Sequence, residues 1–182
     1  MPKITPFLWF DGTAEQAMNF YLSIFKNSKA GRIRRYGDKG AGSEGAVMSV
    51  EFELEGQRFI GLNGGPHYKF SPAISFFVDC TTQAEVDELW DKLSEGGQPN
   101  RCGWLTDKFG VTWQIIPTVL GELLQDQDRE KSGRVMQAML QMQKIDIAAL
   151  QRAYAGRVGP PRHALSGCAA RLSISNKPAV FY

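Results

Sequence analysis

The side chains best suited to catalysis or metal binding are few and widely separated in this sequence. It contains only two histidines, His67 and His163, so no Ser-His-Asp or Cys-His arrangement for nucleophilic catalysis can be assembled convincingly. The three cysteines are odd in number and lack C-x-x-C spacing, which argues against a disulfide framework and against a zinc cluster. We therefore expect reduced thiols at Cys80, Cys102 and Cys168.

His67 directly follows Gly64-Gly65-Pro66 and lies in a predicted loop. An imidazole titrates near neutral pH, so His67 could serve as an acid-base group at the mouth of a pocket. A single loop histidine is more often an ordinary surface residue. The sequence leaves both interpretations open.

The charge and hydropathy of the chain exclude several classes of partner. Lys and Arg number 21 against 19 Asp and Glu, and the segment from Arg157 to Tyr182 holds four of the basic residues and no acidic one. The rest of the chain is mildly acidic without a basic stripe, so we expect no nucleic-acid partner. No apolar run approaches the roughly 20 residues of a membrane-spanning helix, and the first residues lack the features of a signal peptide. These observations predict a cytoplasmic protein with no membrane partner.

The first part of the chain has the pattern of a strand, a helix and further strands. Aromatic and β-branched residues predict a strand from Ile4 to Phe10. Thr13 with Gln16 has capping-box spacing, which predicts a helix start, and a helical apolar stripe follows: Ala17, Phe20, Tyr21 and Ile24. After a probable strand at 31–36, alternation through 48–54 and a turn at Glu55-Gly56 predict a hairpin with 57–63.

The same pattern then restarts with a constant offset. A predicted strand at 73–80 precedes a second capping box, Thr82 with Glu85. Its helix carries a matching stripe: Val86, Leu89, Trp90 and Leu93. Thr82 and all four stripe residues lie 69 positions after their counterparts in the first half. A second hairpin is predicted from 102–107 and 111–117, so each half is predicted to be roughly βαβββ.

These patterns predict one α+β domain over residues 1–156, with halves at about 1–66 and 72–117 and C-terminal helices within 118–156. The Met residues at 136, 139 and 142 are interpreted mainly as packing residues. Gly159-Pro160-Pro161 breaks any helix, and no periodicity follows it. We interpret 157–182 as a tail that is disordered or an artefact of translation.

Three segments carry a more specific similarity: Gly61 to Pro66, Pro72 to Phe76, and Asp107 to Pro117. Over about residues 2–156 the chain resembles the PhnB-like family of the vicinal oxygen chelate superfamily, often labelled 3-demethylubiquinone 3-methyltransferase. The resemblance implies the fold of glyoxalases and bleomycin-resistance proteins, with paired βαβββ modules that each curl a sheet around a pocket. It also implies a homodimer.

The resemblance further implies where metal-dependent members of the superfamily would carry His and Glu ligands. Here Gln114 stands at the position of a ligand Glu, Asn63 stands near the other carboxylate position, and Pro6 and Ala73 stand at about the histidine positions. A neutral amide lacks the charge that helps to hold a divalent cation. We therefore expect no metal and no other cofactor, although a divalent metal held by unusual ligands stays possible.

Strand alternation places Thr112, Gln114 and Ile116 on one face and Trp113 on the other. If Gln114 stands where relatives carry a pocket-facing metal ligand, Trp113 belongs to the helix-facing core. Asn63 and Gln114 are then polar groups in an aromatic cavity, which suits a small organic molecule. The alternative is that both amides only bind strand backbone. The pocket candidates are Phe7, Trp9, Asn63, His67, Phe76, Trp104 and Gln114.

Three functions follow. The first is a homodimeric, metal-free protein that binds a small molecule. The second is an enzyme of the same superfamily: a metal-dependent lyase or dioxygenase, a metal-independent enzyme using Asn63, Gln114 and His67, or the methyltransferase of the family label. The third is a partner protein that has lost the pocket. The Gly61–Gly65 segment is predicted to lead into a strand and not into a helix, which disfavours binding of S-adenosylmethionine by a glycine-rich turn.

Overall fold

The computed structural model describes residues 3–38 and 43–157, and its first half is a four-stranded sheet with one helix. The sheet has the strand order β1-β4-β3-β2; β1 runs parallel to β4, and the other neighbours are antiparallel. Its elements are β1 (Phe7–Phe10), α1 (Ala14–Ile24), β2 (Ser28–Arg35), β3 (Val47–Leu54) and β4 (Gln57–Asn63). Glu55 and Gly56 both have positive φ at the β3–β4 turn, as a tight two-residue hairpin loop requires.

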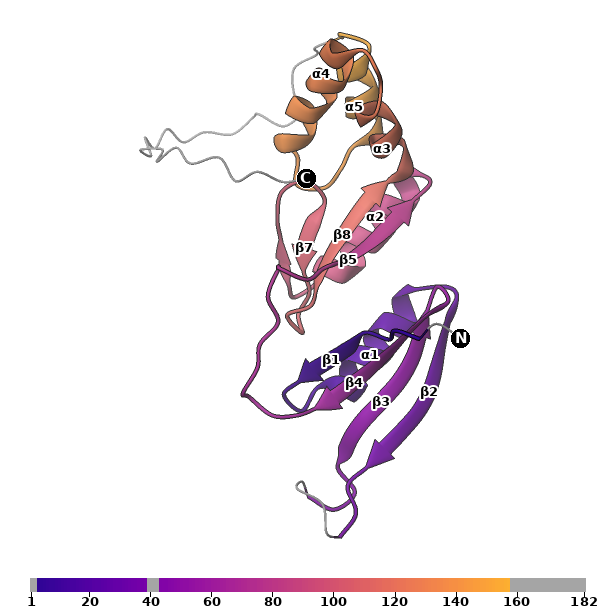
Figure 1. Cartoon of the computed structure of the whole chain (residues 1–182), viewed down its shortest axis with the longest axis vertical. Helices are drawn as coiled ribbons and strands as arrows, with labels where there is room; N and C mark the ends of the chain where they lie inside the picture. Colours follow the sequence, from indigo (N-terminus) through magenta and orange to yellow (C-terminus); the bar gives the residue numbers. More distant parts are fainter. Residues whose placement is uncertain (1–2, 39–42, 158–182) are drawn as a thin grey trace, which may run out of the picture.

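The second half repeats this arrangement. Its sheet has the order β5-β8-β7-β6, with β5 parallel to β8. Its elements are β5 (Phe76–Cys80), α2 (Gln83–Ser94), β6 (Gln98–Pro99), β7 (Trp104–Thr106) and β8 (Thr112–Pro117). The two predicted βαβββ halves and the α+β class are confirmed. Figure 1 shows the two sheets following one another along the long axis of the molecule.

Both first strands begin later than the sequence pattern predicts. β1 begins at Phe7 because Pro6 has no N–H to give to a ladder and contributes only its carbonyl, which accepts from Ile60 N–H. β5 begins at Phe76 because residues 71–74 form a turn instead of extending the strand. In that turn Ile74 N–H donates to the Ser71 carbonyl and Ala73 N–H donates to Ser71 Oγ.

The two helices begin in different ways. Thr82 caps α2 as predicted, because its Oγ accepts from Glu85 N–H at 3.2 Å. The Glu85 carboxylate accepts from Thr81 N–H, one residue further back than a standard capping box places it. The capping box predicted at Thr13 is wrong, since the Thr13 side chain makes no cap hydrogen bond. A residue from β4 caps α1 instead, as described with the candidate site.

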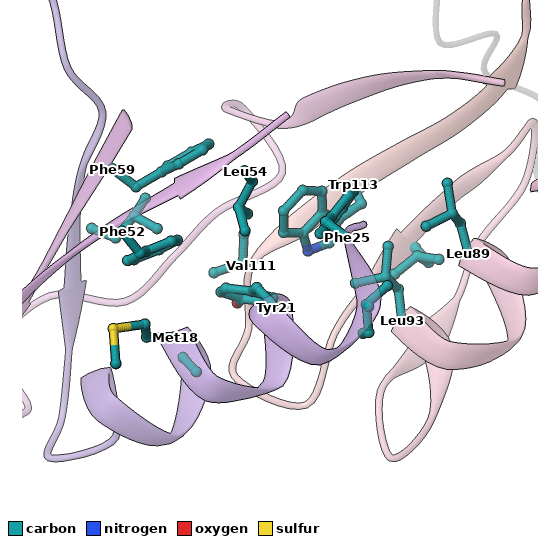
Figure 2. Close-up of a cluster of buried hydrophobic side chains, with 14 of the residues drawn as sticks. Met18, Tyr21, Phe25, Phe52, Leu54, Phe59, Leu89, Leu93, Val111 and Trp113 are labelled. Atoms are coloured by element: carbon teal, nitrogen blue, oxygen red, sulfur yellow. The ribbon is translucent and has the colours of Figure 1, made fainter. Parts of the chain in front are cut away.

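The predicted helix stripes form one core that both halves share. Helix α1 packs on β3 and β4, α2 packs on β7 and β8, and the two helices contact each other. Figure 2 shows Tyr21 of α1 and Phe25 directly after it lying beside Trp113 of β8, with Leu89 and Leu93 of α2 next to them. The ring of Trp113 lies 5.3 Å from that of Tyr21 and 5.4 Å from that of Phe25, between centroids. The halves are therefore joined by aromatic packing between α1 and the second sheet.

A buried carboxylate adds polar contacts to this junction. Asp107, only 3% exposed, precedes the β7–β8 turn, and its Oδ1 accepts from the N–H groups of Phe109 and Val111. Its Oδ2 accepts from Tyr21 Oη at 2.7 Å and from Trp113 Nε1 at 2.9 Å. Burial raises the pKa of Asp107, although its four hydrogen bonds oppose that shift by favouring the carboxylate. Burial and the neighbouring carboxylate raise the pKa of Tyr21 well above its usual value, so its hydroxyl stays a donor.

Three C-terminal helices follow β8 and form a second apolar cluster. They are α3 (Thr118–Leu124), α4 (Arg129–Leu140) and α5 (Ile147–Tyr154). Their buried side chains pack on Ile116 of β8, and Met139 and Met142 pack partly against this cluster while Met136 is exposed. The predicted tail lies outside the described residues, apart from Arg157 at its start, and so do His163 and Cys168. No helix in the described ranges is long and apolar enough to cross a membrane.

Replacing Thr82 with Ala should lower the free energy of unfolding by about 1 kcal/mol, because it removes the only side-chain acceptor for Glu85 N–H. Thr13→Ala is the matched control and should change stability by much less, since Thr13 makes no cap hydrogen bond. Urea denaturation measures both. Equal losses in the two variants would contradict the different helix starts.

Tyr21→Phe should lower the free energy of unfolding by about 1.5–3 kcal/mol, because it removes a donor to a buried carboxylate without opening a large cavity. The measurement is again chemical denaturation. Tyr154→Phe is the control, since Tyr154 also donates to a carboxylate, that of Asp126, but at a position that is only half-buried. A loss for Tyr21→Phe no larger than that for Tyr154→Phe would show that the Asp107 contacts are unimportant.

Candidate functional site

Each sheet has one face covered by α1 or α2 and an opposite face, here called the open face. On β1, Leu8 and Phe10 point into the core while Phe7 and Trp9 lie on the open face. The remaining open-face residues follow from the same alternation along β4, β5, β7 and β8. They include Ile60 and Leu62 on the first sheet, and Phe77, Trp104 and Gln114 on the second. Phe7 is 57% exposed and Phe77 is 55% exposed, so both open faces carry uncovered aromatic rings.

Trp9 is held in place by the segment after β4. Its Nε1 donates to the Gly65 carbonyl at 2.8 Å, and its ring meets that of Tyr68 edge to face with centroids 5.0 Å apart. A Cβ on Gly64 would lie 2.2 Å from the Trp9 ring, so only glycine fits at this position. The glycine-rich segment therefore packs against the first open face, and the next strand or helix after it is β5.

Trp104 and Gln114 are direct cross-strand neighbours on the second open face. Gln114 is partly exposed, and its Nε2 donates to Ser75 Oγ at 2.8 Å. Trp113, next to it, is 3% exposed and packs with Tyr21 and Phe25. The expectation that Trp113 belongs to the helix-facing core is confirmed.

Asn63 does not share a cavity wall with Gln114, and this expectation is wrong. Asn63 is in phase with Phe59 and Gly61, which face α1, and not with the open-face residue Leu62. Its Oδ1 accepts from Ala14 N–H at 2.9 Å, and its Nδ2 donates to the Val47 carbonyl at 3.0 Å. Asn63 is thus the side chain that caps α1, and its amide is bonded to backbone, as the alternative interpretation stated.

The remaining candidates are also dispersed. Phe76 points to the helix side, where it packs on Phe59 and Trp113. His67 is exposed in the segment between β4 and β5. Of the seven candidates, Phe7, Trp9, Trp104 and Gln114 lie on the open faces of two different sheets. No cavity found among the described residues contains all seven, and whether any of them contacts a ligand stays a prediction.

The described part of the chain contains two notable cavities among others. The larger, about 630 Å³, lies between the end of α1, the β3–β4 turn, β5 and α2; Phe76 is the only sequence candidate among its lining residues. The smaller, about 530 Å³, includes Asn63 with Tyr36, Glu15 and Gly64. Sequence analysis missed the larger cavity because its walls come from elements of both halves that are far apart in the sequence. Its only local signal was that Phe77 and Asp79 share one face of β5.

The residues of the open faces do not fit the metal centre of the metal-dependent superfamily members. Over residues 3–38 and 43–157, no three His, Cys, Asp or Glu side chains come together as possible ligands. Gln114 offers a neutral amide already bonded to a hydroxyl, which is a weak donor set for a divalent cation. Burial raises the pKa of the Cys80 thiol to about 12 and also raises that of Cys102, so neither is a ready thiolate nucleophile.

The family model for 3-demethylubiquinone-9 3-methyltransferase matches residues 2–116. A protein from Bacillus cereus described as a PhnB protein is 40% identical; the match covers 64% of this chain and all of that chain, with a TM-score of 0.60. A protein from Pseudomonas aeruginosa is 20% identical over 62% of this chain and 95% of its own, with a TM-score of 0.54, and shares the fold. A glyoxylase/bleomycin resistance protein/dioxygenase domain from Frankia sp. EAN1pec is 14% identical over 62% of this chain and 94% of its own, with a TM-score of 0.40. No curated protein matches the chain.

Asn63→Ala should lower the free energy of unfolding by about 1–3 kcal/mol, because it leaves Ala14 N–H and the Val47 carbonyl without their partner. Gln114→Ala should cost less, since its side chain bonds the Ser75 hydroxyl at a partly exposed site. Thermal and urea denaturation compare the two amides. The reverse order of stabilities would contradict a capping role for Asn63.

Proposed function

Because the chain belongs to the 3-demethylubiquinone-9 3-methyltransferase family of PhnB-like proteins, with the glyoxalase/bleomycin-resistance fold, we propose that it is a metal-independent, cytoplasmic homodimer that binds a small organic molecule. The observation that carries the proposal is the pair of open faces with uncovered aromatic side chains. Such apolar surface is unusual on a protein that acts as a monomer and is typical of interfaces and binding grooves. The ligand itself is not identified by the sequence or by the fold.

The shape of the two halves supports a dimer with composite sites. Each sheet is open on one face and has a strand, β1 or β5, at the end of its strand order. In a two-fold dimer the first open face of one chain would lie opposite the second open face of its partner, and the arrangement would occur twice. Each resulting pocket would take Phe7 and Trp9 from one chain and Phe77, Trp104 and Gln114 from the other.

The side chains on these faces favour a largely apolar ligand held by few hydrogen bonds. Gln114 beside Ser75 supplies a neutral polar group amid aromatic rings, which suits orientation of a carbonyl or hydroxyl. The charged groups of the first open face are already paired, since Glu51 lies 3.3 Å from Arg58 and 3.9 Å from Arg34. We propose binding without a metal because Gln114 supplies only a neutral amide and no three possible metal ligands come together over the described residues.

The methyltransferase named for the family receives no support from the glycine-rich segment. Gly61 is in β4, and the next strand or helix after Gly64-Gly65 is β5, so no helix N-terminus is presented by this turn. A glycine-rich turn that holds a nucleotide normally leads from a strand into a helix. Binding of S-adenosylmethionine is therefore an outcome for the test and not part of the proposal.

The first experiment is sedimentation equilibrium of the whole chain together with native mass spectrometry of protein purified without added ligand. The proposal expects a dimer that retains, or takes up from a library of aromatic carbonyl compounds, one small molecule for each composite pocket. Metal analysis accompanies it. A monomer with no ligand, or a stoichiometric divalent ion whose removal abolishes a turnover, would overturn the proposal.

Phe7→Glu should weaken dimerisation by about tenfold or more, because an unpaired carboxylate would have to be buried at the interface. Phe7 is 57% exposed in the single chain, so the fold itself should tolerate the change. Leu140→Glu is the control, since Leu140 is 42% exposed on α4 and belongs to neither sheet. Sedimentation equilibrium of both variants is the measurement. An unchanged dimer for Phe7→Glu would place the interface elsewhere.

A further inference from the structure

The larger cavity lies against the free edge of β5. β5 is the last strand in its sheet, and residues from both of its faces line the cavity: Phe76 and Val78 from the helix side, Phe77 and Asp79 from the open side. The opposite walls come from the end of α1, from the β3–β4 turn and from α2. This site is therefore built between the two halves and differs from the open-face surface in most of its residues. It goes beyond the function proposed above.

The walls of this cavity are aromatic. Figure 2 shows Phe25, Phe59 and Trp113 on the side shared with the core. The Phe76 ring meets the Phe59 ring at 80° with centroids 5.1 Å apart, and it lies 5.3 Å from Trp113. Phe77 adds a fifth, exposed ring at the mouth. At about 630 Å³, the space is within the usual range for small-molecule sites.

The rim of the cavity is acidic, with four carboxylates against the single ammonium of Lys26. Three of the carboxylates already have partners: Glu55 binds Asn27, Glu85 binds Thr81, and Glu88 binds Lys92 and Lys26. Asp79 is exposed next to Phe77 and has no hydrogen-bond or ion-pair partner among the residues that the structure describes. One uncompensated negative charge therefore stands at the mouth of an aromatic cavity.

We propose that this cavity binds an organic cation, a quaternary ammonium or protonated amine that also carries an apolar group. The faces of Phe and Trp rings attract cations within about 6 Å, and a partly desolvated aromatic site strengthens that attraction. The carboxylate of Asp79 supplies a counter-charge, and the other rim carboxylates favour the approach of a cation over that of an anion. The apolar group of the ligand would cover Phe76 and Val78.

The test is isothermal titration of the full chain with benzyltrimethylammonium, benzyl alcohol and benzenesulfonate, which share the ring and differ in charge. The expected result is saturable binding of the cation only, with a dissociation constant below about 10 mM. In ¹⁵N NMR spectra the indole N–H of Trp113 should shift on titration, and those of Trp9 and Trp104 should shift less. Equal affinity for benzyl alcohol, preference for benzenesulfonate, or no saturable binding would overturn the proposal.

Two variants locate the binding site. Asp79→Asn should weaken binding of the cation roughly three- to tenfold, since one near-surface charge is lost. Phe76→Leu should weaken it by a similar factor by removing a ring while keeping an apolar wall. Asp11→Asn, at an exposed acid outside the cavity, is the control and should have no effect. Equal affinities for Asp79→Asn and Asp11→Asn would overturn the assignment, whatever the oligomeric state proves to be.

Discussion

The carboxylate of Asp107 joins the two halves of this protein. It accepts from Tyr21 in the first half, from Trp113 in the second, and from two backbone N–H groups of its own turn. A buried carboxylate is tolerated only when its hydrogen-bonding capacity is used, and here four donors approach from fixed directions. The same contact holds Tyr21 of α1 beside Trp113 of β8, and it thereby helps to orient the two repeated units relative to each other.

That orientation decides which surfaces are free to bind. Because α1 and α2 share one core with Trp113 between them, the opposite faces of both sheets carry Phe7 and Phe77 uncovered. It also leaves β5 without a neighbour beyond β8, so that the β3–β4 turn, α1 and α2 enclose a cavity along this edge. The chemistry available to the chain therefore lies on the open faces and at the junction of the halves.

Much of the fold could be predicted because it depends on local patterns that occur twice. The offset of 69 residues correctly paired the stripes of α1 and α2, and the turn at Glu55-Gly56 lies where the alternation of the flanking strands indicated. The repeat was less reliable for side chains that bind across elements. Thr13 and Thr82 occupy equivalent positions, yet only Thr82 caps its helix. Thr82 has the extended backbone of a capping residue, with ψ of 159°, whereas Thr13 has ψ of 10°, and Asn63 supplies the acceptor for Ala14 N–H. Residue spacing within one segment cannot reveal a hydrogen-bond partner that lies 49 residues away in the sequence.

By itself the sequence determined the two βαβββ units and their helix stripes, since each follows from the periodicity of contiguous residues. Alternation put Trp113 on the face opposite Gln114, and the family resemblance indicated that this face is the core. Only the tertiary structure decided which way the amides face. Alternation groups Asn63 with Phe59 and Gly61, but β4 is apolar on both sides, so the sequence could not tell whether this face or that of Ile60 and Leu62 meets the helix, and packing against α1 settled it. Likewise, the partners of Asp107 and the walls around β5 come from distant segments that only the folded chain brings together.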